Sequence, residues 1–160
     1  MVGDALSSAL TLHRVSFLLE KIADHALQDS MDLTFSQWMI LRSLAGNPSC
    51  SQQSIARCRD LTQAAVSRQV EALRAKKLLN RRENPKNRRE HILTLTSVGR
   101  AKFAAGADLI SKSLRGHFAQ LDAAQTKALD AALGDLLQSI YAEIRPCGCP
   151  GEKEEISLAV

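Results

Sequence analysis

Apolar residues recur at helical spacing near both ends of the chain. Across residues 4–29 an apolar side chain returns every three or four positions, and no Gly or Pro interrupts the pattern. A second apolar face follows Asp122 and runs to the Arg145-Pro146 pair. Both patterns predict long amphipathic helices, with apolar positions at Leu6, Leu10, Phe17, Leu18, Ile22 and Ala26 in the first and Leu129, Leu133, Leu136, Leu137, Ile140 and Ile144 in the second.

Capping residues divide the middle of the chain into shorter helices. Thr34 with Gln37 has the form of a capping box, so a helix is predicted from there to Gly46-Asn47-Pro48. Ser51 can cap a short third helix, and Thr62 can cap a fourth. The fourth helix has a narrow apolar stripe of Val66, Val70 and Leu73. Later helix starts are predicted at Thr96 or Ser97, for a helix to about His117, and at Asp122 with Gln125.

A β-hairpin is predicted after the fourth helix. Residues 78–83 and 92–96 are long enough to pair as strands. Asn84-Pro85 breaks regular structure between them, because Pro fixes its own φ and disfavours helix at the preceding residue. We expect a solvated basic tip, well suited to contact phosphate, that carries Lys86, Arg88 and Arg89.

Positive charge is concentrated around this hairpin. Residues 57–102 hold 13 Lys/Arg and 4 Asp/Glu, a formal charge of +9, whereas the other 114 residues hold 8 Lys/Arg and 13 Asp/Glu, a formal charge of −5. A basic segment between acidic flanks is the electrostatic pattern of a protein that binds a polyanion. The simpler interpretation, a solvated charged surface, explains the charge but not the helix pattern that precedes it.

Length and composition limit the class of protein. A chain of 160 residues with 45% hydrophobic content can form one domain with a buried core, or a small domain with extensions. No apolar run reaches the ~18 residues of a membrane span, and the first six residues lack the basic start and apolar block of a signal peptide. We therefore expect a cytoplasmic protein whose four cysteines are reduced.

The third and fourth helices together have the form of a helix–turn–helix unit over residues 51–75. In such a unit the second helix lies in the major groove and presents its N-terminal side chains to base edges. Gln pairs with adenine, Arg with guanine, and small Ala residues let the backbone approach. The candidate DNA contacts on this helix are Thr62, Gln63, Ala64, Ser67, Arg68, Gln69 and Arg74.

Residues 61–81, LTQAAVSRQVEALRAKKLLNR, followed by Asn87-Arg88-Arg89 and by residues 93–99, LTLTSVG, resemble the MarR family of winged helix-turn-helix regulators. The resemblance extends over nearly all of residues 5–145. It implies a mainly α fold with a small β-hairpin wing, dimerised through the N- and C-terminal helices. It also implies a recognition helix in the major groove, a wing Arg in the minor groove, and repression relieved by a small molecule or by thiol oxidation.

The chain departs from the family pattern at two positions. Asn87 stands where the family usually has Asp, so it can accept a hydrogen bond but supplies no charge to steady Arg89. Lys77 stands where the family often has Gly, at a helix end that favours a left-handed residue. A side chain there costs about 1 kcal/mol if that conformation is kept.

Four segments are expected: residues 1–33 as a dimerisation helix, 34–97 as the winged DNA-binding module, 98–145 as C-terminal dimerisation helices, and 146–160 as a tail. Within the module, Arg89 is the expected minor-groove residue, because Arg suits the negative potential of a narrow groove. Arg88 and Lys86 are expected on phosphates. The alternative is an ordinary exposed charged turn.

The sequence is compatible with two triggers that could relieve repression. His13 and Arg14 on the first helix, with Trp38 and Arg42 on the second, provide a cation beside apolar walls, which suits a small aromatic acid. Cys147-Gly148-Cys149 provides two thiols that can oxidise or bind a soft metal. Cys58 on a short helix is more typical of a core residue, and no cofactor is required by either trigger.

No enzyme motif is present, because the chain has no Gly-rich phosphate loop, His-Glu-x-x-His or Gly-x-Ser-x-Gly. The sequence therefore favours a homodimeric, sequence-specific regulator of double-stranded DNA, acting as a repressor with a small-molecule effector. One rival is a thiol- or soft-metal-responsive regulator using Cys147 and Cys149. The other is a sequence-indifferent architectural DNA-binding protein, against which Gln63, Arg68 and Gln69 argue.

Overall fold

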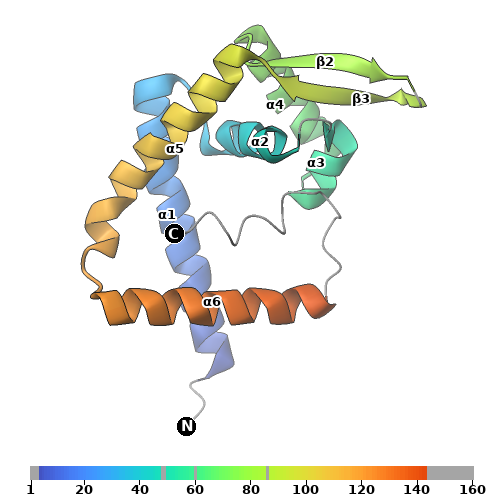
Figure 1. Ribbon diagram of the computed structural model, residues 1–160. Coiled ribbons are helices and arrows are strands. Elements are labelled where there is room, and N and C mark those ends of the chain that lie inside the picture. Colours follow the sequence, from blue (N-terminus) through green and yellow to red (C-terminus); the bar gives the residue numbers. More distant parts are fainter. Residues whose placement is uncertain (1–3, 48–49, 60, 86, 144–160) are drawn as a thin grey trace.

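The computed structural model describes residues 4–47, 50–59, 61–85 and 87–143, with side chains omitted for residues 87–90. The elements follow the order α1 (Ala5–Met31), α2 (Phe35–Gly46), β1 (Cys50–Ser51), α3 (Gln52–Cys58), α4 (Gln63–Ala75), β2 (Leu79–Asn84), β3 (Asn87–Leu95), α5 (Ser97–Phe118) and α6 (Ala123–Glu143). In Figure 1 the two long helices α1 and α5 lie side by side, and α2, α3, α4 and the hairpin form a compact module at one end of them.

The predicted capping residues begin their helices. Thr34 and Gln37 form a complete capping box at α2. Asp122 and Gln125 exchange the same pair of bonds before α6, where the Asp122 N–H donates to Gln125 Oε1 and the Gln125 N–H to Asp122 Oδ1. The other four helices of the described chain are capped by a side-chain oxygen that accepts a backbone N–H, from Asp4, Ser51, Thr62 and Thr96. The predicted helix end at Arg145-Pro146 lies outside the described residues.

The hairpin differs from the prediction in length and in its partner strand. Strand β3 begins at Asn87, so Arg88 and Arg89 belong to a strand and not to a loop. The pairing extends to Asn84↔Asn87, and Pro85 follows it, because Pro cannot donate to a ladder. A third strand, β1, pairs antiparallel with β3 and gives the sheet order β1-β3-β2. This two-residue strand has no alternating pattern and was not predicted.

One hydrophobic core holds the module together. The predicted stripe of α4 is fully buried, because Val66, Val70 and Leu73 have no exposed surface. They pack with Leu27 from α1, with apolar residues of α2 and α3, and with Leu93 from β3. Because α4 uses one face for this core, its opposite face is free to meet another molecule.

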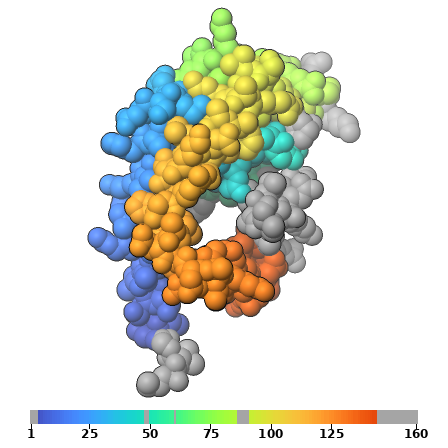
Figure 2. Space-filling view, turned by 60° about the vertical axis from the view of Figure 1, so that its left-hand side comes forward, coloured from blue at the N-terminus to red at the C-terminus, as the bar shows by residue number. Residues whose placement is uncertain are grey.

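The terminal helices leave large apolar side chains exposed. Helix α6 buries none of its residues, and Figure 2 shows it apart from the module, at the far end of α5. The exposed apolar side chains of α1 and α6 include Leu6, Leu10, Phe17 and Leu18, and Leu129, Leu133, Leu136, Leu137 and Ile140. These are the faces that the sequence pattern indicated, and one chain does not cover them.

An aromatic stack joins α2 to α5. The Trp38 ring lies between Phe35 and Phe103, with ring centroids 5.9 Å and 5.5 Å away, and its Nε1–H donates to the Phe103 carbonyl at 3.1 Å. Gly106 makes room for the indole, since a Cβ there would lie 2.6 Å from the Trp38 ring and 3.3 Å from a Leu27 methyl. The stack therefore fixes the module on the long helices.

Replacing Gly106 by Ala should lower the free energy of unfolding by about 1–3 kcal/mol, because the added methyl overpacks the Trp38 contact. Gly116→Ala on the same helix is the matched control, since a Cβ there has nothing within 4 Å. The control should stabilise by up to ~1 kcal/mol through helix propensity. Urea unfolding of both variants provides the measurement. Equal effects at the two sites would contradict the contact.

Candidate nucleic-acid interface

The outer face of α4 carries the polar residues that sequence analysis selected. Thr62 begins the helix by accepting the Ala65 N–H at 3.1 Å. With the core stripe turned inward, the exposed residues of this region are Thr62, Gln63, Ala64, Arg68, Glu71 and Arg74, while Ser67 and Gln69 are half-buried. All seven predicted helix contacts are thus exposed or half-buried.

The wing places further basic residues beside α4. Strand β2 pairs with β3 from Leu79↔Leu95 to Asn84↔Asn87, with a register shift at Glu83/Asn84. Arg81 is half-buried and Arg82 is exposed on β2. Arg88 and Arg89 lie along β3, their side chains and Lys86 being outside the described structure. The contacts predicted for these three residues stay predictions.

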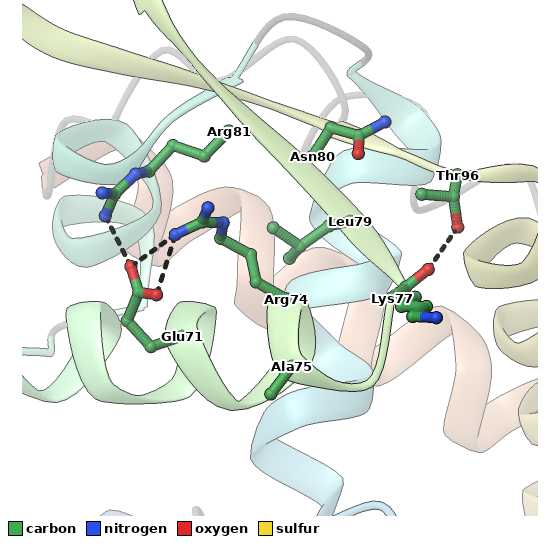
Figure 3. A pocket seen from close by; sticks show the side chains of 8 residues that line it. All are labelled: Glu71, Arg74, Ala75, Lys77, Leu79, Asn80, Arg81 and Thr96. Atoms are coloured by element: carbon green, nitrogen blue, oxygen red, sulfur yellow. Dashed lines mark hydrogen bonds and ion pairs between the residues drawn. The ribbon is translucent and has the colours of Figure 1, made fainter.

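A carboxylate connects the wing to α4, and sequence reasoning missed it. Glu71 accepts from Arg74 Nη1 at 2.8 and 3.1 Å and from Arg81 Nη1 at 2.6 Å (Figure 3). Spacing alone could have suggested the Glu71–Arg74 pair, because residues three apart are neighbours on a helix. Arg81 lies on β2, so its bond to Glu71 depends on how the hairpin folds back onto α4.

A second junction connects α4, both hairpin strands and α5. The Thr96 hydroxyl lies 2.9 Å from the Lys77 carbonyl and 3.1 Å from the Leu78 carbonyl, and it accepts the Gly99 N–H at 2.9 Å. The Thr96 N–H also donates to the Leu78 carbonyl. A Cβ on Gly99 would lie 1.9 Å from that oxygen, so α5 approaches as closely as Gly permits.

Lys77 adopts the left-handed conformation that the family comparison implied for this position. Its φ is 58°, and it is one of two non-Gly residues with positive φ in the described chain, the other being Asp32 at the end of α1. The backbone reverses here from α4 into β2. Lys77 therefore places a non-Gly side chain in a left-handed conformation, with the conformational cost that the sequence led us to expect.

The predicted effector residues do not form one cleft within a chain. Trp38 is a core residue with 8% of its surface exposed. Trp38 and Leu27 both lie close to Gly106. His13 precedes Leu27 by 14 residues, which places it ~21 Å away along α1. His13 and Arg14 are exposed, and Arg42 approaches Met39 Sδ at 4.0 Å. A hollow of about 420 Å³ does lie between α1 and α5, lined by Lys21, Ile22, His25, Ala26, Asp29 and Ser113.

The cysteines have different environments. Cys50 is a free, buried thiol on β1, and burial raises the pKa of that thiol, so it stays protonated. Cys58, at the end of α3, is disulfide-bonded and so departs from the expectation that all thiols are reduced. Cys147 and Cys149 lie outside the described residues. Within residues that are described, no group of three or more His, Cys, Asp or Glu could hold a metal ion.

No helix in the described part of the chain is long and apolar enough to cross a membrane. The exposed apolar residues of α1 and α6 alternate with charged ones, among them Glu20 and Lys21 on α1.

Residues 31–90 match the sequence model of the MarR family. This stretch extends from the end of α1 into β3 and contains α4, and the fold of 81% of the chain also matches a solved MarR structure. The chain is similar to the MarR family over these residues and in its fold. Its fold is therefore a winged helix-turn-helix, as predicted, in which α4 corresponds to the second helix of the motif and β2–β3 to the wing.

Individual relatives and solved structures match most of the chain. The uncharacterised HTH-type transcriptional regulator YhbI of Bacillus subtilis is 27% identical over 117 residues, which span 73% of this chain and 75% of YhbI. Apo MarR from E. coli has a TM-score of 0.75 at 21% identity and covers 81% of this chain and 95% of its own. A structure of Bordetella bronchiseptica BpsR, on regulation of its DNA binding by 6-hydroxynicotinic acid, has a TM-score of 0.69 at 27% identity and covers 81% and 98%.

Similarity to this family indicates the class of function. MarR-family proteins are transcriptional regulators and not enzymes, so this chain is a transcriptional regulator of the DNA-binding type.

Proposed function

We propose that this MarR-like regulator is a homodimeric repressor that reads a pseudo-palindromic operator with α4 and is released by a small anionic effector. The observation that carries this proposal is the exposed face of α4. Its buried stripe fixes which side faces outward, and that side presents Arg68, while Gln63 is exposed at the first residue of the helix, beside a basic wing. Side chains of this kind recognise base edges in the major groove.

The exposed apolar faces support a homodimer. Leu10 and Phe17 on α1 are 60% and 50% exposed, and Leu136 on α6 is 46% exposed. Apolar faces of this length are costly in water, and pairing with a second copy covers them on both chains at once. Twofold symmetry of the protein then requires twofold symmetry of the operator.

The effector proposal rests on the α1 surface and on one relative. Arg14 provides an exposed cation, and the hollow between α1 and α5 lies farther along the same helix, beside Lys21. BpsR is regulated by an aromatic acid, 6-hydroxynicotinic acid. A ligand at this place releases DNA if it binds one arrangement of the dimer better than another.

A thiol trigger is the second candidate, because Cys58 of the helix-turn-helix engages in a disulfide. Oxidation would then act on the DNA-reading module itself. In this case Cys147 and Cys149 are the residues that sequence analysis assigned to the response.

Arg68→Ala should cost ~1–3 kcal/mol of operator binding and reduce the preference for operator over random DNA, if Arg68 reads a base. Fluorescence anisotropy on both duplexes measures the two affinities. Arg115→Ala is the matched control, since Arg115 is exposed at the far end of α5. An equal loss on operator and random DNA would make Arg68 a phosphate contact. A wild type with no preference at all would favour the architectural class.

Small aromatic acids should release wild-type protein from its operator, and Arg14→Ala should need higher concentrations of the same acid. A panel of benzene and pyridine carboxylic acids, with DNA release as the readout, provides the test. A Cys147→Ser/Cys149→Ser double variant should respond like wild type. The thiol trigger is correct instead if no acid acts, while an oxidant or soft metal releases DNA only when both cysteines are present.

A further inference from the structure

The cluster around Glu71 contains more positive than negative charge. Arg74, Arg81 and Lys77 line one hollow of about 470 Å³, and Glu71 is the single carboxylate among its lining residues (Figure 3). The formal charge of these four side chains is therefore +2. Two guanidinium groups from separate elements, α4 and β2, meet at one carboxylate. Such a hollow attracts an anion, because its own carboxylate neutralises only part of the charge.

The hollow opens on the same face of α4 as Arg68. Ala64, Arg68, Glu71 and Ala75 follow at intervals of four, three and four residues, which places them on one side of a helix. Glu71 lies ~4.5 Å farther along the helix axis than Arg68, at 1.5 Å per residue. A duplex lying along this face therefore passes Arg68 first and the hollow next.

Three of the four charged groups around the hollow have exposures that leave them accessible to a ligand. The side chains of Glu71, Arg74 and Arg81 are 49%, 39% and 29% exposed. Each Arg uses Nη1 for Glu71, so the other guanidinium donors remain for a second acceptor. A guanidinium carries five N–H donors in a planar fork that matches phosphate oxygens.

We propose that this hollow binds a phosphate of the DNA backbone through Arg74, Arg81 and Lys77, and that Glu71 is a positioning residue for the two arginines. This inference rests on the proposed role of α4 as the DNA-reading helix. Free Arg side chains lose rotamer entropy when they bind. Glu71 orders both before DNA arrives, so less entropy is lost on binding. Through Arg81, Glu71 also fixes strand β2 of the wing relative to α4.

Whether Glu71→Gln raises or lowers the affinity for DNA tests the positioning role. Removing a negative charge near a polyanion raises affinity if charge alone matters. If Glu71 positions the arginines, its loss lowers affinity for a mixed-sequence duplex of about 30 base pairs by about three- to tenfold. Glu83→Gln is the matched control, since Glu83 is an exposed carboxylate of β2 on the wing. That control should bind slightly tighter than wild type.

Salt dependence tests the phosphate contact. Across a KCl series, Arg81→Ala should reduce the slope of log affinity against log salt by about 0.9 for each protomer. Arg81→Lys should keep most of that slope yet bind more weakly, because an ammonium lacks the fork. Arg115→Ala, far from the hollow, should leave the slope unchanged.

Lys77→Gly separates DNA binding from stability. Gly relieves the left-handed backbone at φ 58°, so the unfolding midpoint should rise. The same variant removes a cation from the hollow, so its affinity for the mixed-sequence duplex should fall. A loss of binding in a more stable protein cannot come from misfolding.

Two results would overturn the proposal. One is tighter binding by Glu71→Gln, to the same extent as Glu83→Gln. The other is an unchanged salt slope for Arg81→Ala in protein that unfolds like wild type. Neither outcome bears on base reading, which Arg68→Ala tests by the ratio of operator to random affinity. Wild-type protein that binds no duplex would contradict both the hollow and the proposed function.

Discussion

The carbonyl of Leu78 is the point at which the recognition helix, the wing and the long helix α5 are joined. It accepts the Thr96 N–H and lies 3.1 Å from the Thr96 hydroxyl, while Gly99 allows α5 to approach it without a side chain between them. A buried carbonyl without partners is unfavourable, so these bonds hold the end of α4 to the start of α5. A shift of α5 would therefore move α4 and the wing with it.

This junction explains how the winged module and the long helices can act together. The Trp38 stack fixes α2 on α5, and the Leu78 junction fixes α4 and the wing on α5. The apolar faces of α1 and α6 stay exposed at the opposite end, away from the module. In the proposed dimer, a ligand that changes how these helices pair changes the spacing of two rigid modules, which is the coupling that an effector requires.

Local features could be predicted from the sequence, whereas long-range pairings could not. The caps at Thr34, Thr62 and Thr96 were found because each side-chain oxygen and the N–H it accepts are three residues apart. The buried stripe of α4 was found because helix period alone defines it. The left-handed residue at Lys77 was anticipated only through resemblance to a family that often has Gly there. Strand β1 was missed because two residues contain no period.

The same limit applies to the candidate site. Arg68 could be placed on the outer face of α4 from the stripe alone, whereas Gln63, three residues before Val66, is exposed because it begins the helix. The Glu71–Arg81 bond and the Trp38–Phe103 stack join residues 10 and 65 positions apart. Both depend on how the hairpin and α5 return to the module, which periodicity does not specify. The effector residues were grouped by chemistry, and α1 proved too long to bring Arg14 near Trp38 within one chain.

The most direct test of the account is selection of bound duplexes from fragmented genomic DNA of the organism that carries this chain. Two rigid modules on a twofold dimer should enrich an inverted repeat whose half-sites lie about one helical turn apart, ~10 base pairs centre to centre. Enrichment of a single unrepeated motif would contradict the paired arrangement, and recovery of DNA without any sequence preference would contradict base reading by α4.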